Sequence, residues 1–172
     1  MMNFLNCHFK SEDVDLFRES SRIIVNGISN SGKSFFIDKL IRFYKDKFNF
    51  IYIFGFKDHP LTNEEILKKK IILHEDLSSL FEKNLENSLV YIDDLYLFSL
   101  NSFDVVNIFT KGRHVNISFI LVMQNIFGRG KFSRDILLNA NYFILFKLRD
   151  LTQIEVLARQ LFGKSSSSQF VK

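Results

Sequence analysis

The chain of 172 residues has one cysteine, one proline and no tryptophan. The single cysteine, Cys7, excludes an internal disulfide framework and is typical of a reducing compartment. The four histidines are scattered without the spacing of metal ligands, so we expect no zinc site. No apolar run approaches the ~20 residues that span a bilayer. The first residues, MMNFLNCHFK, have neither the apolar core nor the small-residue cleavage site of a signal peptide.

An excess of one charge is also missing. The 23 basic and 19 acidic residues give a net charge of +4, which excludes a histone-like polycation. The distribution is less even, because residues 105–134 contain no Asp or Glu. The basic residues of this stretch are Lys111, Arg113, Arg129, Lys131 and Arg134. The pattern fits a local basic surface or an ordinary solvated face.

Short apolar runs alternate with amphipathic ones along most of the chain. Strands are expected at 22–26, 50–54, 71–73, 89–92, 117–123 and 142–146, and helices at 34–47, 63–70, 77–84, 101–110, 134–139 and 151–162. Strands that are apolar on both faces predict an α/β fold, with helices covering both sides of a mostly parallel sheet. We expect a lead-in segment at 1–21, one compact domain at 22–162 and a polar tail at 163–172.

The stretch GISNSGKS, residues 27–34, has the spacing of a phosphate-binding loop, and it lies between an expected strand and an expected helix. Glycines let the backbone turn tightly and approach phosphate oxygens, and the amides at the helix N-terminus favour anions. The residues expected to bind the nucleotide are Gly27, Asn30, Ser31, Gly32, Lys33 and Ser34. Lys33 would bridge the β- and γ-phosphates of ATP, and the Ser34 hydroxyl would coordinate Mg²⁺.

Two aspartates follow the strand LVYI. Asp93 fits the second Mg²⁺ partner of a phosphate-loop enzyme. Asp94 is positioned to polarise a water against the γ-phosphate, which an ATPase needs and a kinase does not. The other reading of the pair is a turn that caps the next helix.

Gln124 ends the next strand, ISFILVM. In ATPases with an acidic base, this strand lies between the phosphate-loop strand and the strand that ends at the metal aspartate, so Gln124 would contact the γ-phosphate. Arg113 lies before the same strand, at its far end, and cannot reach the nucleotide of its own chain. In a ring it could reach the nucleotide of a neighbour. The alternatives are a loop glutamine and a surface arginine.

With these residues, the chain resembles the viral genome-packaging ATPases of the FtsK–HerA superfamily, above all the poxvirus-type enzymes of large DNA viruses, virophages and Polintons. The likeness rests on VNGISNSGKS, LVYIDDLY, KGRHVNISFILVMQN and YFILFKLRDLTQIEVLARQLF.

The resemblance implies a three-layer P-loop NTPase sandwich of the RecA-like (ASCE) type, hydrolysis of ATP with Mg²⁺, and a homo-oligomeric ring that moves double-stranded DNA into a preformed capsid at its vertex. It also implies a catalytic role for Lys33, Asp94 as base, Gln124 as sensor and Arg113 as arginine finger, with Ser34 and Asp93 at the metal. Such a virus-encoded protein would act at the virion assembly site, in host cytoplasm or nucleus, and would not be secreted.

Two other functions fit part of the sequence. A small-molecule kinase would use the phosphate loop, and GRGKFSR, with Arg129 and Arg134, as a lid over phosphates. It would leave Asp94 and Gln124 without a role. A non-catalytic nucleotide-binding module would fit the short length and the Asp at position 94, where most such ATPases have Glu.

Overall fold

The computed structural model describes residues 15–17, 19–55, 71–74, 85–93, 101–125, 130–148, 150 and 152–162; for 71–74 and 161–162 only the backbone is considered. The strands are β1 (Arg22–Asn26), β2 (Phe50–Phe54), β3 (Ile71–His74), β4 (Ser88–Ile92), β5 (Ser118–Met123) and β6 (Tyr142–Leu145). The helices are α1 (Lys33–Tyr44), α4 (Phe103–Lys111), α5 (Ser133–Asn139) and α6 (Thr152–Phe162), with the 3-10 turns η1 (Lys45–Lys47) and η4 (Gly112–Val115).

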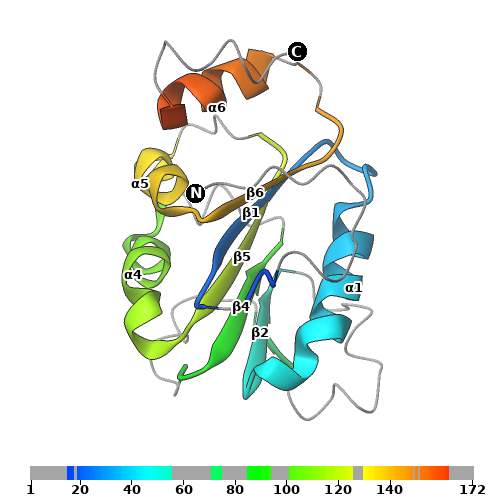
Figure 1. Ribbon diagram of the computed structural model, residues 1–172, viewed down its shortest axis with the longest axis vertical. Coiled ribbons are helices and arrows are strands. Elements are labelled where there is room, and N and C mark those ends of the chain that lie inside the picture. Colours follow the sequence, from blue (N-terminus) through cyan, green and yellow to red (C-terminus); the bar gives the residue numbers. More distant parts are fainter. Residues whose placement is uncertain are drawn as a thin grey trace.

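The six strands form one sheet in the order β3-β2-β4-β5-β1-β6, and every pairing is parallel. Helices flank both faces of the sheet (Figure 1). The predicted α/β fold is therefore confirmed. So is the expected position of β5, which pairs with β1 on one side and with β4 on the other.

Two apolar clusters separate along the sheet because side chains in a strand alternate between its faces. In β1, Ile23 and Val25 pack in the cluster on the α1 side, whereas Ile24 packs in the cluster that includes residues of α4, α5 and α6. All residues of β4 and β5 are buried. This burial on both faces explains why these strands have continuous apolar sequences.

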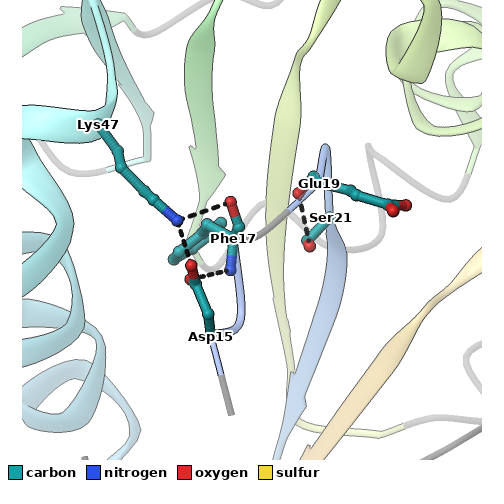
Figure 2. Close-up of polar contacts among 5 residues, drawn as sticks. All are labelled: Asp15, Phe17, Glu19, Ser21 and Lys47. Carbon is teal, nitrogen blue, oxygen red and sulfur yellow. Dashed lines mark hydrogen bonds and ion pairs between the residues drawn. The ribbon is translucent and has the colours of Figure 1, made fainter.

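The amino-terminal residues of the described chain join this core. Leu16 and Phe17 are buried in the cluster on the α1 side. Figure 2 shows Lys47 reaching two groups of this segment: its ammonium donates to a carboxylate oxygen of Asp15 and, at 3.0 Å, to the carbonyl of Phe17. Packing therefore begins before Arg22, within the segment that was expected to be a lead-in, and the division into domains stays a prediction.

The observed elements differ from the expected ones mainly at their ends. The expected helix at 34–47 begins at Lys33 and tightens into η1 after Tyr44. The helix expected at 101–110 is α4 followed by η4, which turns the chain into β5. The helices expected at 63–70 and 77–84, and the polar tail, lie outside the described residues. Among the helices that the structure describes, none combines the length and the apolar character needed to cross a membrane.

Candidate nucleotide-binding site

The phosphate loop leaves the carboxyl end of β1 and enters α1 through two left-handed residues. Asn30 has a φ of 58° and Gly32 a φ of 94°, and the amide of Ser31 donates to the carbonyl of Ile28 at 3.3 Å. A φ near 90° is rare for any residue with a Cβ, so this turn requires Gly32. The loop therefore has the tight form that its sequence predicts.

The segment after β6 forms one wall of the loop. The amide of Ile28 donates to the carbonyl of Lys147 at 3.0 Å. A Cβ on Gly27 would lie 2.6 Å from the Cβ of Phe146, so no other residue fits at position 27 without a shift of this wall. The ring of Phe146 also meets Phe36 of α1, with 5.7 Å between centroids. The phosphate loop is thus held between α1 and the end of β6.

Lys33 is buried, and its ammonium donates to the carbonyls of Gly27 and Ile28, at 2.8 and 2.7 Å. These bonds hold the positive charge inside the loop. A phosphate bound there would compete with the two carbonyls for the same protons, and a charge-assisted bond to an anion is the stronger one. The arrangement fits a lysine that exchanges loop carbonyls for phosphate oxygens.

The amino terminus of α1 adds a second source of positive potential beside the ammonium of Lys33. The first bond within the helix runs from the amide of Phe36 to the carbonyl of Gly32, so the amides of Lys33, Ser34 and Phe35 have no partner in the helix ladder. The first turn contains no acidic side chain and its cap residue is a glycine. Such a helix end favours an anion.

Asp93 lies at the carboxyl end of β4, and its neighbours fix its position. The hydroxyl of Tyr91 donates to Oδ2 of Asp93 at 2.6 Å, and the amide of Asp93 donates to the carbonyl of Phe54 at 2.9 Å. Gly55 follows Phe54 with a φ of 143°, and a Cβ there would lie 2.6 Å from the carbonyl oxygen of Asp93. The end of β2 therefore packs directly against the backbone of this aspartate.

The oxygen ligands fit Mg²⁺ bound together with a nucleotide. Ser34 supplies a hydroxyl and Asp93 a carboxylate, and both come from the carboxyl edge of the sheet. Within the described residues, no group of three or more His, Cys, Asp and Glu side chains could hold a metal alone. Mg²⁺ commonly binds through one or two protein oxygens, water and substrate phosphates, so this small ligand set is suitable.

Gln124 directly follows β5 at the same edge. The carbonyl of Met123 accepts a hydrogen bond of 3.2 Å from the amide of Gly27, which brings residue 124 next to the phosphate loop. Because β5 lies between β1 and β4, Gln124 lies between the loop and the strand of Asp93. The structure thus gathers Gly27 to Ser34, Asp93 and Gln124 at one edge of the sheet, as the sequence predicts.

Of the other two predicted catalytic residues, the structure describes only Arg113. Arg113 is in η4 at the opposite, amino edge of the sheet, beyond the start of β5. The six residues of β5 alone span about 20 Å, so Arg113 does not reach the loop of its own chain. Asp94 lies outside the described residues, as does Arg129 of the possible lid. Arg134 is exposed in the first turn of α5.

Sequence reasoning missed four contributors to the site. Tyr91 and Gly55 position Asp93, and Phe146 with Lys147 encloses the loop. Of these four residues, only Tyr91 could have been found from the sequence, because Tyr91 and Asp93 are two positions apart in a strand and so face the same side. Asn26 was also missed: it is fully buried just before Gly27, and neither polar atom of its side chain has a hydrogen-bond partner among the described residues.

Comparison with known proteins finds similarity in structure only. No protein-family model matches the sequence, and no curated protein matches it either.

Among solved structures, the genome packaging NTPase B204 of Sulfolobus turreted icosahedral virus 2, in complex with ATP-gammaS, is similar at 16% identity. The TM-score is 0.65, and the match covers 89% of this chain and 87% of B204. EssC (ATPases 2 and 3) of Geobacillus thermodenitrificans is similar at 16% identity with a TM-score of 0.62, over 86% of this chain and 35% of EssC. The pCW3 conjugation coupling protein TcpA is similar at 16% identity with a TM-score of 0.58, over 90% of this chain and 55% of TcpA. The resemblance expected from the sequence is thus confirmed at the level of the fold, and the chain has the parallel-sheet fold of the P-loop ATPases.

Proposed function

We propose that the protein is a motor that hydrolyses ATP with Mg²⁺ and moves double-stranded DNA into a viral capsid. The observation that carries this proposal is the position of β5, which separates β1 from β4 and is followed by Gln124 beside the phosphate loop. This strand order belongs to ATPases that activate a water. A kinase acting on a bound small molecule has no use for a polar group at that point.

The names of similar structures support the same proposal. B204 is a genome packaging NTPase, and its match with this chain extends over most of both proteins. Three parts of the proposal rest on the sequence resemblance alone: the double-stranded DNA substrate, the capsid vertex as partner, and a place of action at the virion assembly site in host cytoplasm or nucleus.

The described residues suggest how hydrolysis would proceed. Lys33 and the amides at the start of α1 would hold the phosphates, with Ser34 and Asp93 on the metal, which would neutralise phosphate charge. Asp94 would accept a proton from the attacking water. The oxygen of that water bonds to the γ-phosphorus, and the bond to the bridging oxygen breaks, which yields ADP and phosphate. Gln124 would contact the γ-phosphate.

Arg113 would act on the nucleotide of a neighbouring subunit in a ring. It is exposed at the amino edge, whereas the phosphate loop lies at the carboxyl edge. Only another copy can bring the two edges together. An arginine supplied in this way stabilises charge in the transition state, and its loss typically costs roughly 10³-fold or more in rate.

The first test is steady-state ATP hydrolysis with and without long double-stranded DNA. We expect DNA to stimulate turnover, the stimulation to fall steeply with salt, and both Lys33→Ala and Asp94→Asn to abolish it. Asp104→Asn, an exposed aspartate in the first turn of α4, is the matched control and should retain activity. Phosphate transfer to a nucleoside would favour the kinase, and ATP binding without turnover in the presence of DNA would favour a regulatory module.

A second test addresses Arg113. Each of Lys33→Ala and Arg113→Ala should be inactive alone. A mixture should recover activity, because a subunit with an intact Lys33 can lie beside one with an intact Arg113. Activity of the mixture no greater than that of the two variants measured apart would contradict a role for Arg113 on a neighbouring nucleotide.

A further inference from the structure

The amino edge of the sheet carries two arginines close together. Arg22 begins β1 and Arg113 lies in η4. Burial of the Arg22 guanidinium, and secondarily the positive charge of Arg113, lower the pKa of Arg22. Arg22 donates to Oδ1 of Asn141 at 2.9 Å, and in the described part of the chain neither guanidinium meets a carboxylate. Two uncompensated guanidinium groups favour a ligand with negative charge.

A pocket of about 840 Å³ lies beside Arg113 at the same edge. The apolar side chains that line it are Leu85, Ile108, Val115 and Ile117, its basic ones are Lys111 and His114, and its one acidic side chain is Glu86. Arg113 itself lies in sequence between two lining residues, Gly112 and His114. The pocket therefore combines apolar side chains with more basic than acidic groups, and Val115, 48% exposed, extends the apolar surface outward.

The opposite edge carries a matching apolar side chain. Phe35 follows Ser34 in the first turn of α1, and 66% of it is exposed. The ammonium of Lys39 lies 4.5 Å from the centroid of its ring. Exposure alone does not distinguish Phe35, because Phe43 on the same helix is 69% exposed. The difference is position, since Phe35 adjoins the expected metal ligand and Phe43 lies two turns away, toward the amino edge.

We propose that a second copy of this chain inserts its Phe35 into the amino-edge pocket, which brings Arg113 of one copy to the phosphate loop of the next. This inference rests on the proposed function, because it supplies the contact through which Arg113 would act. The geometry follows from adjacency in sequence: Phe35 is next to Ser34, and Arg113 is flanked by pocket residues. A ring seated between Gly112 and His114 therefore has Arg113 beside the neighbour's Ser34.

The distribution of charge also favours a second copy of this chain as the partner. The amino edge carries Arg22, Lys111 and Arg113 against one carboxylate in the pocket lining, Glu86, and the carboxyl edge of a second copy gains negative charge when it binds a triphosphate. The two edges are different surfaces, so the contact is head-to-tail and closes into a ring only if the rotation between copies allows it. Association should strengthen when ATP is bound and weaken as the salt concentration rises.

Cross-linking between two variants tests the contact directly. Phe35→Cys and Val115→Cys are each made in a Cys7→Ser background, mixed with ATP-gammaS, oxidised and separated without reductant. We expect a disulfide-linked dimer of the two variants, at a yield roughly tenfold above that of Phe43→Cys mixed with Val115→Cys, because oxidation traps even a weakened contact in which positions 35 and 115 adjoin, whereas position 43 lies two turns away. Equal yields with Phe35→Cys and Phe43→Cys would overturn the proposal.

A substitution separates this contact from a role of Phe35 in nucleotide binding. Phe35→Ser should weaken self-association by roughly tenfold in sedimentation velocity. Because the substitution changes only the side chain and leaves the backbone amide of residue 35 at the start of α1, the affinity for a fluorescent ATP analogue, measured on dilute monomer, should stay within about twofold of wild type. Lost nucleotide affinity with unchanged association would make Phe35 a nucleotide contact and overturn the proposal. Neither assay requires DNA or turnover, so cross-linking without ATP hydrolysis would contradict the proposed function and leave the contact standing.

Discussion

The hydroxyl of Tyr91 donates a hydrogen bond of 2.6 Å to the carboxylate of Asp93, and both residues are buried at the end of β4. Residues two apart in a strand face the same side, and Tyr91 belongs to the cluster on the α1 side of the sheet. The carboxylate expected to hold the metal is therefore oriented by its own strand. A bond to an ionised acceptor is stronger than one between neutral groups.

Tyr91→Phe should lower the free energy of unfolding by about 1–3 kcal/mol, because a buried carboxylate loses a donor. It should also raise the Mg²⁺ concentration needed for half-maximal binding of a fluorescent ATP analogue. Urea unfolding and a Mg²⁺ titration measure the two effects. Tyr52→Phe is the matched control, since Tyr52 is equally buried but belongs to the other cluster. An equal change in Mg²⁺ dependence for both variants would argue against orientation by Tyr91.

Gly55→Ala should disturb Asp93 from the backbone side. The new Cβ would lie 2.6 Å from the carbonyl oxygen of Asp93, and the φ of 143° is one that alanine rarely adopts. Strain of this kind costs of order 1–3 kcal/mol. We expect a lower urea midpoint and weaker binding of ATP with Mg²⁺.

Gly112→Ala serves as the comparison for Gly55→Ala. Its Cβ would meet the side chain of Ile117 at 3.2 Å, at the amino edge. It should change stability without changing the affinity for nucleotide. If both glycine variants bind nucleotide as wild type does, the packing of Gly55 does not matter for Asp93.

Asp15→Asn should destabilise the fold at neutral pH but not in acid. The hydrogen bond from Lys47 holds the pKa of Asp15 below its usual range, so its contribution is present above the unfolded pKa of about 4 and is lost as the pH falls through the folded pKa. The side chains of Asp15 and Lys47 are exposed, so we expect the substitution to lower the free energy of unfolding by less than about 1 kcal/mol at pH 7.

The free energies of unfolding of wild type and Asp15→Asn in urea should converge as the pH is lowered through the folded pKa of Asp15. Glu19→Gln changes a nearby exposed carboxylate and leaves the pair of Asp15 and Lys47 intact, so it should match wild type throughout (Figure 2). If the difference in free energy of unfolding between wild type and Asp15→Asn grows in acid, the stabilisation does not come from the ionised carboxylate of Asp15.

Asn26→Leu should raise stability and lower turnover. Both polar atoms of the Asn26 side chain are buried and have no hydrogen-bond partner within the part of the chain that the structure describes, which typically costs about 1–3 kcal/mol, and leucine has a similar shape without polar atoms. A residue that destabilises the fold next to a functional loop is commonly retained for activity. Urea unfolding and ATP hydrolysis measure the two effects. A loss of stability would show that the amide has a partner in solution.

The sequence predicted the sheet well because its central strands carry a strong signal. β4 and β5 are apolar on both faces, and the polar residues at their ends, Asp93 and Gln124, follow at once. Parallel strands bring such ends to one edge, so Gly27, Asp93 and Gln124 could be grouped from strand boundaries alone. Helix ends were less exact, because the change from α1 to η1 after Tyr44 leaves no marked pattern in the sequence.

Contacts between distant segments could not be predicted in this way. Nothing in the residue types of Phe146 and Lys147 indicates that they adjoin Gly27 and Ile28, since the contact follows from the pairing of β1 with β6. Gly55 has no motif around it, and its role depends on the approach of the Asp93 carbonyl. The periodicity of apolar residues indicates which face of a helix or strand is buried, but it does not indicate which other element packs against that face.

The bond between Ile28 and Lys147 also bears on when the site can form. The phosphate loop is synthesised early, but one of its walls is made only after β6. A nascent chain that has not reached Lys147 lacks this wall, and long-range contacts of this kind form late and slowly. We therefore expect a newly made subunit to bind ATP only after β6 has paired with β1.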